Sequence, residues 1–312
     1  MGFEVVLGNR VAVRLKNSII LFDPKVADFF SFVSHSHIDH SPYHVFSPIY
    51  ATKETIDLLR VADPFLDAKE VKLNKWYDFD DFRVKFLSAG HILGSSQILV
   101  EIEGKSILYS GDISLESNPT CRPIGIEQAD ILIVEATYGN PNFILPRKEE
   151  VVEKFLKWVR KRLFEGKRVI IGAYQIGKSQ EVIKILNEEG IVPKVTETIR
   201  RYSEVYKKNG VKLEFTSEES DVLIKPIQLI RKNEEACVMT GWVNFGFFNT
   251  FGFPLSDHAD FNQLLEFVEL VCPKKVICIH GYAKELAHSI RKKLGINAVS
   301  LLGLQKFKIE LE

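Results

Sequence analysis

The 312-residue sequence predicts an α/β fold, and three patterns along the chain lead to this prediction. The first section alternates apolar and polar residues as strands do, and the middle section alternates strands with amphipathic helices. Strands return around Glu235 and are followed by two helices. No internal repeat or low-complexity linker interrupts the sequence, and its length suits about two domains of ordinary size.

The first section is expected to form strands at residues 3–15, 18–22, 82–87, 97–102 and 106–109, with a helix at 53–61. In the middle section, a buried strand at 131–134 precedes a helix at 148–164, a strand at 168–171 and a helix at 178–189. The last section predicts a helix at 260–271, a strand at 275–279 and a helix at 283–294.

Three histidines and a carboxylate lie close together in the run Ser34-His35-Ser36-His37-Ile38-Asp39-His40. Because the run follows an apolar stretch, His35, His37 and Asp39 alternate on a segment leaving a strand and project to one side. Imidazole nitrogen mixed with carboxylate oxygen, without a nearby thiolate, suits zinc, with manganese or iron as the other candidates. We interpret the run as half of a two-metal site, and the alternative is a histidine-rich surface loop.

Other polar residues lie where predicted strands stop or beside apolar segments, namely Asp23, His91, Asp112, His258 and His280. Loops at strand ends of a rigid scaffold are where catalytic groups collect. Asp112 is expected to bridge the metal ions, because a carboxylate commonly holds two ions about 3.5–4 Å apart. Alone, Asp112 would be typical of a Gly-Asp turn and His280 of a core histidine, but together these residues favour a metal site.

Composition excludes some classes of protein. The 41 Lys and Arg equal the 41 Asp and Glu, so net charge gives no support for a polyanionic partner. Basic clusters between residues 160 and 208 favour nucleic acid only slightly over solvated helix faces. The four cysteines form no CxxC pair and are expected to be reduced and buried. Without a targeting signal or a membrane-spanning apolar run, a soluble cytoplasmic protein with no membrane partner is expected.

The segment from Gly172 to Ser179 matches the phosphate-loop pattern G-x-x-x-x-G-K-[ST] between a strand and a helix. No apolar strand ending in an acidic residue follows to hold magnesium, and Ala-Tyr-Gln-Ile makes a bulky loop. A plain strand-loop-helix connection is therefore favoured over nucleotide hydrolysis. A third hypothesis is that Lys178 and the helix N-terminal amides contact a phosphate of bound nucleic acid.

The order of Asp23, the histidine run, His91 and Asp112 resembles that of the metallo-β-lactamase fold superfamily. Residues 134–139, 256–260 and 279–281 resemble motifs A, B and C of its β-CASP nuclease branch. These motifs extend over nearly the whole chain. The chain is most similar to the small exonuclease-like and mRNA 3′-end-processing-factor-like members.

This resemblance implies two Zn²⁺ ions, with Mn²⁺ as a substitute, on seven ligands: His35, His37 and His91 for one ion, Asp39, His40 and His280 for the other, and Asp112 between them. Asp23 would contact the ligands and orient them without binding a metal ion itself. Catalytic roles fall to Asp39, Asp112, Glu135 and His258, with Glu135 hydrogen-bonded to His258 and His258 protonating the leaving oxygen. Lys178 and Ser256 are expected to contact a substrate phosphate.

The fold that the resemblance implies is an αββα four-layer sandwich with a short β-CASP-type α/β insertion. Residues 1–140 and 237–312 would form the two halves of the sandwich, and residues 141–236 the inserted cap. This cap is shorter than in the large RNA-cleaving members. Its length, residues 172–178 and Thr240-Gly241-Trp242 are most similar to exonuclease-like DNA enzymes, whereas His280 is the RNA-type residue of motif C. RNA and single-stranded DNA both remain open.

The resemblance implies a zinc-dependent nuclease that hydrolyses phosphodiester bonds of RNA or single-stranded DNA. The attacking group would be a hydroxide activated by two metal ions, and the enzyme could act as an exonuclease. Nucleic acid is the expected partner, and a homodimer is compatible with the sequence. One alternative is a small-molecule metallo-hydrolase of lactonase or thioesterase type, which leaves Glu135 and residues 256–258 unexplained. Another is a non-catalytic nucleic-acid-binding subunit, which the complete set of ligands disfavours.

Overall fold

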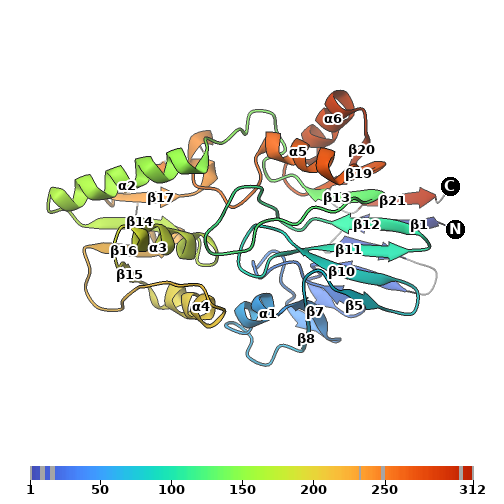
Figure 1. Ribbon diagram of the computed structural model, residues 1–312, viewed down its shortest axis with the longest axis horizontal. Coiled ribbons are helices and arrows are strands. Elements are labelled where there is room, and N and C mark those ends of the chain that lie inside the picture. The colour runs from blue at the N-terminus through green and yellow to red at the C-terminus, as the bar shows by residue number, and fades with distance from the viewer. Residues whose placement is uncertain are drawn as a thin grey trace. The chain divides into compact units, whose positions relative to one another are not determined.

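The computed structural model describes residues 2–7, 11–14, 18–231, 233–246, 250–301 and 305–310. The chain divides into two compact units, and Figure 1 labels their elements. The first unit comprises residues 1–117, 121–144 and 258–312, and the second comprises residues 118–120 and 145–257.

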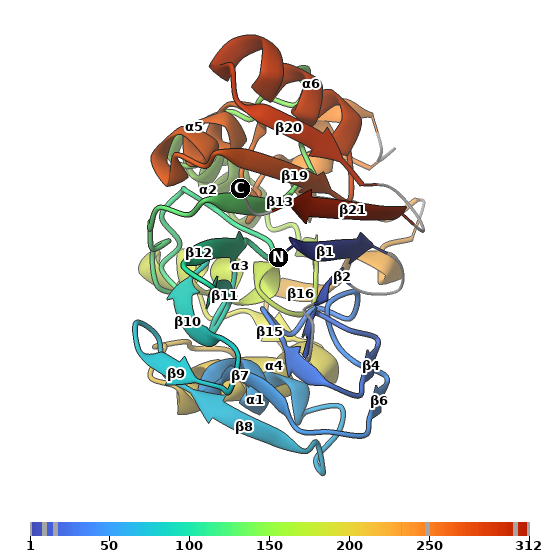
Figure 2. The ribbon, with the colours of Figure 1, turned by 90° about the vertical axis from the view of Figure 1, so that its right-hand side faces the viewer.

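Two seven-stranded sheets form the framework of the first unit (Figure 2). The first sheet contains, in spatial order, β21 (Gln305–Glu310), β1 (Gly2–Leu7), β2 (Val11–Arg14), β3 (Ile19–Phe22), β5 (Phe30–Phe32), β7 (Ile49–Thr52) and β8 (Ala68–Val71). The second contains β20 (Asn297–Ser300), β19 (Lys275–Ile279), β13 (Ile131–Glu135), β12 (Lys105–Tyr109), β11 (Ser96–Ile102), β10 (Arg83–Ser88) and β9 (Trp76–Asp78). A small sheet pairs β4 (Val26–Ala27) with β6 (His44–Val45).

Alternation of side chains along the strands explains how these sheets pack. In β12, Ile107 and Tyr109 belong to the apolar core shared with Phe22 and Phe32 of the other sheet. Leu108, between them, faces the opposite way and joins a second core. The two sheets therefore pack face to face through one set of side chains.

Helices cover the outer faces of both sheets. α5 (Phe261–Val271) and α6 (Ala283–Leu294) contribute Leu264, Phe267 and Leu286 to the second core, on the outer face of the second sheet. α1 (Lys53–Leu59) places Ile56 against a third core of the first sheet. The resulting order of layers is helix, sheet, sheet, helix, and it confirms the predicted αββα sandwich (Figures 1 and 2).

Parallel pairing brings several strand ends to one edge of each sheet. In the second sheet β12, β13, β19 and β20 are parallel neighbours, and Glu135 pairs in register with Ile279. In the first sheet β3, β5, β7 and β8 are parallel, with Phe22 opposite Phe32. Loops that follow parallel neighbours leave the same edge, where α/β proteins usually bind ligands.

The second unit is an α/β unit of its own. Its parallel sheet has the order β15 (Lys194–Val195), β16 (Val222–Pro226), β14 (Val169–Ala173), β17 (Ala236–Met239) and β18 (Gly252–Phe253). The helices are α2 (Lys148–Phe164), α3 (Lys178–Glu188) and α4 (Glu197–Lys208), with 3₁₀ turns at Ile227–Leu229 and Gly241–Phe245. The expected cap ends at residue 236, whereas this unit extends to Asp257, because β17 pairs with β14 and β18 pairs with β17.

Several predicted elements are confirmed. α2 and α6 have the predicted bounds, and α3 and α5 differ by one residue at one end. The segment predicted at 3–15 contains two strands, with residues 8–10 and 15 outside the described part of the chain. The sequence did not predict β7, β8, β15, β16 or α4.

Among the helices in the described part of the chain, none is long and apolar enough to cross a bilayer.

We expect Phe267→Ala to lower the free energy of unfolding by about 3–5 kcal/mol, because it leaves a cavity in a close-packed core. Phe267 is 0% exposed, whereas Phe65 in the same unit is 95% exposed. The control Phe65→Ala should change the free energy of unfolding by less than about 0.5 kcal/mol. Urea denaturation of both variants measures the difference, and similar losses in the two would contradict this placement of the core.

Candidate active site and metal centre

The Asp23 carboxylate organises the loop that follows β5. Asp23 directly follows β3, and its backbone is left-handed with φ of 45°. Oδ1 accepts a hydrogen bond from the Ser34 amide at 2.6 Å. Oδ2 lies 2.6 Å from Ser34 Oγ, 2.8 Å from Tyr109 Oη and 2.7 Å from His40 Nδ1. One buried carboxylate therefore joins the ends of β3, β5 and β12.

Three imidazole nitrogens converge beside this anchor. His37 Nδ1 lies 3.2 Å from His35 Nε2 and 3.1 Å from His91 Nε2. Four ligand atoms placed tetrahedrally at zinc bonding distance of about 2.0–2.1 Å would be about 3.3–3.4 Å apart. The observed nitrogen separations fit that arrangement closely.

The state of His35 also suits a metal ligand. Its ring is completely buried, and Ser34 Oγ lies 2.9 Å from its Nδ1, which leaves Nε2 to face His37. Burial, together with the charges of neighbouring histidines, holds the pKa of His35 well below its usual value. The neutral ring can therefore offer a lone pair from Nε2.

Asp112 lies between the two groups of predicted ligands. Its Oδ2 is 3.4 Å from His35 Nε2, 3.4 Å from His40 Nε2 and 3.9 Å from His91 Nε2. His35, His37, His91 and Asp112 offer ligand atoms that all lie within 4.8 Å of one another. This position suits the predicted bridging carboxylate.

Electrostatics favour a cation at this place. Burial raises the pKa of Asp112 to about 7, and the charge of Glu135 adds to the effect while His40 opposes it. Burial would lower the pKa of His40, but the charges of Asp112 and Asp23 outweigh it and raise this pKa to about 10. Without a metal ion, protons on His40 and Asp112 offset the negative charge of the buried carboxylates. The donor atoms and the local charge both fit a metal centre.

The predicted second set of ligands is more open. Asp39 Oδ2 lies 3.8 Å from His40 Nε2, and the Asp39 side chain is 75% exposed. The rings of His40 and His280 have centroids 6.0 Å apart. Asp23 engages His40 Nδ1, so the Nε2 atom is the one that faces Asp112 and Asp39. The structure thus brings His40 and Asp112 together and places Asp39 and His280 at the margin.

Glu135 and His258 form an acid-base pair next to the cluster, in which Glu135 is buried and the His258 side chain is 20% exposed. His258 Nδ1 lies 3.2 Å from Glu135 Oε2, and the Ile113 amide donates to Glu135 Oε1 at 2.7 Å. Asp112, Glu135 and His258 have ligand atoms within 4.8 Å of one another. Burial alone would raise the pKa of Glu135, but the charge and hydrogen bond of His258 outweigh it and lower this pKa. Glu135 is therefore ionised and fixes the orientation of the His258 ring.

His280 reaches the site through a constrained turn. It follows β19 with a left-handed φ of 59°, and the next residue, Gly281, has φ of 39°. A Cβ at Gly281 would lie 2.2 Å from the Ala136 carbonyl oxygen, so only glycine fits there. Left-handed backbone at a non-glycine residue is unfavourable and concentrates at functional sites.

The chain is similar to a family of metallo-hydrolases and to proteins named for action on nucleic acids. Residues 252–301, which include His258 and His280, match the family model described as a Zn-dependent metallo-hydrolase RNA specificity domain. A probable DNA ligase of Opitutus terrae is 30% identical over 287 residues, which are 84% of this chain and 28% of that protein. An RNase J-like protein of Methanocaldococcus jannaschii is 33% identical over 178 residues, which are 50% of this chain and 42% of that protein.

The chain is similar to β-CASP nucleases of the metallo-β-lactamase fold. It spans less than half the length of each of these two relatives. The fold is also that of a protein of unknown function from Enterococcus faecalis V583, with a TM-score of 0.71 at 14% identity over 99% of this chain and 100% of the other. The family description and the cluster of histidines and carboxylates together identify a metal centre.

Two contributors to the site were missed by sequence reasoning. The hydroxyl of Ser34 joins Asp23 to His35, and Tyr109 donates to Asp23 from the other sheet. Burial and Asp23 hold the pKa of Tyr109 well above its usual value, so it stays a donor. Ser34 directly precedes the first histidine of the run, and that position was the available signal.

Lys178 does not have the environment expected for a phosphate ligand. It is 1% exposed, and its Nζ pairs with Glu181 at 2.9 Å and with Asp257 at 3.5 Å. Lys148 also pairs with Glu181, at 2.9 Å. Two lysines and two carboxylates therefore neutralise one another inside the second unit. Ser256 is half-buried beside Asp257, and its contact with phosphate stays a prediction.

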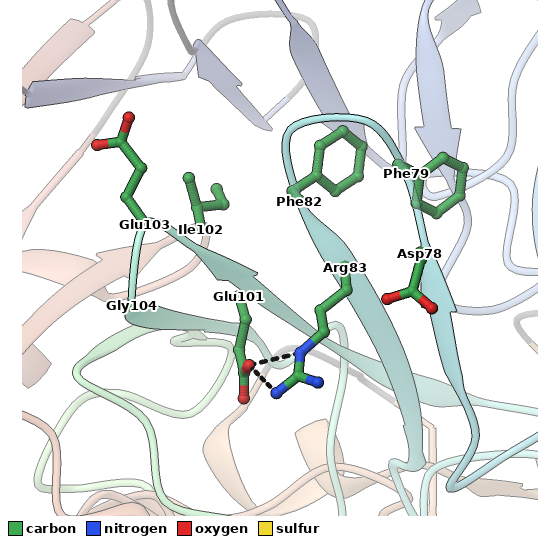
Figure 3. A pocket seen from close by; sticks show the side chains of 8 residues that line it. All are labelled: Asp78, Phe79, Phe82, Arg83, Glu101, Ile102, Glu103 and Gly104. Carbon is green, nitrogen blue, oxygen red and sulfur yellow. Dashed lines mark hydrogen bonds and ion pairs between the residues drawn. The ribbon is translucent and has the colours of Figure 1, made fainter.

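Figure 3 shows a pocket that differs in character from the metal centre. Its volume is about 270 Å³, and it is lined by Asp78, Phe79, Phe82, Arg83, Glu101, Ile102, Glu103 and Gly104. The lining includes the first residue of β10 and the last of β11, whereas His91 lies in the loop that joins the other ends of these two strands. The cation there, Arg83, pairs with Glu101. The pocket is separate from the candidate site.

Zinc should stabilise the folded protein because the ligands converge only in that state. At a Zn²⁺ concentration one hundred times the Kd, we expect the free energy of unfolding to rise by about 2.7 kcal/mol. His91→Ala should remove most of this gain. The control His44→Ala should retain it, because His44 is exposed on β6. Denaturation with and without chelator measures the gain, and equal gains in the two variants would disprove the ligand role of His91.

Lys178→Met should lower the free energy of unfolding by about 3–5 kcal/mol, since it removes the buried cation between Glu181 and Asp257. Lys184, on the same helix, is the matched control because its pair with Glu188 is partly exposed and 3.7 Å long. Lys184→Met should cost about 0–1 kcal/mol. Urea denaturation measures both variants, and a small loss in Lys178→Met would show that Lys178 is not enclosed as described.

Proposed function

We propose that the chain is a zinc-dependent nuclease that hydrolyses phosphodiester bonds of RNA or single-stranded DNA. The observation that carries this proposal is the Glu135–His258 pair, whose ligand atoms lie within 4.8 Å of those of Asp112. A metal centre alone would serve many hydrolases. An oriented proton donor beside it suits a reaction in which an alkoxide oxygen leaves.

The residues present would hold two Zn²⁺ ions, with His35, His37 and His91 on one side of Asp112 and Asp39, His40 and His280 on the other. Mn²⁺ would suit the same oxygen and nitrogen donors. When bound, the ions supply Lewis acidity, which stabilises charge on phosphoryl oxygens and lowers the pKa of water. Asp23 keeps the His40 ring in the orientation that exposes Nε2 to the site.

His258 supplies the proton in this proposal. Its Nδ1 faces the ionised Glu135 carboxylate, so Nδ1 carries a proton and Nε2 is the atom left to act on substrate. Glu135 stabilises the cationic ring from which Nε2 donates a proton to the leaving oxygen. Glu135 itself keeps its charge throughout, supported by the Ile113 amide.

The distribution of charge supports a polyanionic substrate. The second unit has 20 Lys and Arg against 16 Asp and Glu, and the first has 21 against 25. The carboxylates of the first unit include Asp23, Asp39, Asp112 and Glu135, which bound cations would offset. Although the net charge of the whole chain is zero, the second unit is basic and can attract phosphates.

The comparisons support both RNA and DNA as the substrate. The family model that matches residues 252–301 is described by RNA specificity, which supports RNA. The relative from Opitutus terrae has the name of a DNA ligase, which supports DNA. Assays should therefore present RNA and single-stranded DNA of one sequence, labelled at either end.

We expect His258→Ala to lower turnover by about 10²–10⁴-fold while zinc content stays unchanged, because only the proton donor is lost. Asp112→Ala should lose zinc as well as turnover. The measurements are gel analysis of labelled strands and zinc content of the same preparations. His288→Ala, a histidine on α6 outside the site, is the control.

Equal loss of zinc in His258→Ala and Asp112→Ala would contradict this division of roles. Stoichiometric zinc without cleavage of any strand would favour a small-molecule hydrolase on the same centre.

A further inference from the structure

Lys25 contacts the turn that carries the second set of ligands. It follows Pro24 and directly precedes β4. Its Nζ donates hydrogen bonds to the Ile38 carbonyl at 2.7 Å and to the Ser41 carbonyl at 3.4 Å. These two carbonyls stand on either side of Asp39 and His40, so one ammonium group spans the pair of ligands.

The backbone of Lys25 holds the far end of the same turn. Its carbonyl accepts hydrogen bonds from the amides of Tyr43 at 2.8 Å and His44 at 3.3 Å. The Tyr43 ring lies with its centroid 4.9 Å from Lys25 Nζ, a cation–π distance that restricts the lysine side chain. Lys25 therefore contacts the turn at two places, through its ammonium group and through its carbonyl oxygen.

Asp39 depends on its backbone more than His35, His40 and His91 do. The side chains of His35 and His91 are 0% exposed and that of His40 is 7% exposed, so packing directs them. Asp23 further holds His40 through Nδ1. The side chain of Asp39 is 75% exposed, so surrounding side chains enclose little of it. The conformation of the turn decides where its carboxylate points.

We propose that Lys25 is a positioning residue that holds the turn so that Asp39 and His40 face the same metal ion. This inference rests on the proposed metal centre. Lys25 acts through hydrogen bonds to the backbone of the turn and does not itself touch the ion. Partners behind metal ligands are known to tune affinity in this way, and losing one typically costs about 10–100-fold.

Charge alone would have the opposite effect. The ammonium of Lys25 interacts with the carboxylates of Asp39 and Asp23, so it competes with a cation for them. If Lys25 acted only through its charge, a neutral side chain would make zinc bind more tightly. If Lys25 positions the turn, the same change makes zinc bind more weakly. The sign of the effect separates the two roles.

The test is Lys25→Met, which keeps most of the side-chain length and removes the charge and the donors. The control is Lys69→Met, because Lys69 also lies over a tyrosine ring, that of Tyr50 at 5.4 Å, on β8. Zinc binding is measured on metal-free protein by competition with a chromophoric chelator. Thermal denaturation of each metal-free variant checks that it is folded.

We expect Lys25→Met to weaken one of two zinc equivalents by about 10–100-fold and to leave the other within about threefold. Lys69→Met should match the unaltered protein. Lys25→Arg, which keeps the charge and donors, should recover part of the affinity for the weakened equivalent.

Unchanged or tighter zinc binding in Lys25→Met would overturn the inference and leave the metal centre intact. Equal weakening of both equivalents would also overturn it, since the effect would not be specific to the turn. Failure of the unaltered protein to bind zinc would remove the metal centre itself. If zinc binds with the expected difference but no strand is cleaved, the role of Lys25 stands and the nuclease proposal fails.

Discussion

The carboxylate of Asp23 is the contact on which the architecture of the site depends. It lies at the end of a strand in the first sheet and receives the hydroxyl of Tyr109 from the end of a strand in the second. It also holds Ser34 and His40 on the loop between them. A polar contact thus joins the two sheets beyond their apolar core, and the predicted metal ligands lie next to this contact.

Burial gives this contact its strength and its consequences. Asp23 is 7% exposed and donors surround it, so the energetic cost of burying a charge is offset by hydrogen bonds. The same carboxylate then engages His40 Nδ1 and turns Nε2 toward the site. Asp23 therefore supports His35 through the Ser34 hydroxyl and supports His40 directly. Ligands on both sides of Asp112 therefore share one support.

Much of this arrangement is visible in the sequence, for identifiable reasons. The helix α2 was predictable because Val151, Phe155 and Val159 form a buried stripe at helical spacing. The histidine run was predictable because its spacing is rare and follows an apolar strand. By contrast α4 was missed, since the side chains it buries include only Ile199 and Tyr206 as large apolar residues. Short strands such as β8, with exposed Lys69 and Glu70, give no alternation to detect.

The environment of Lys178 could not be predicted, because sequence does not show which way a side chain turns. The residues around it match the phosphate-loop pattern, and they lie between a strand and a helix as that pattern requires. Glu181, one turn along the helix, and Asp257, far along the chain, enclose its ammonium instead. The direction of Asp39 is likewise invisible in sequence, since a ligand motif does not show that its carboxylate is exposed.

The parallel neighbours β13 and β19 have a consequence for how the protein is made. The segment between them includes most of the second unit, so β19 pairs with β13 only after that segment has been made. During synthesis from the N-terminus, His35 to Asp112 leave the ribosome well before His258 and His280 do. A nascent chain can therefore display most of the ligand loop while it still lacks its proton donor. Under the proposed function, hydrolytic competence arises only after His258 and His280 have been synthesised.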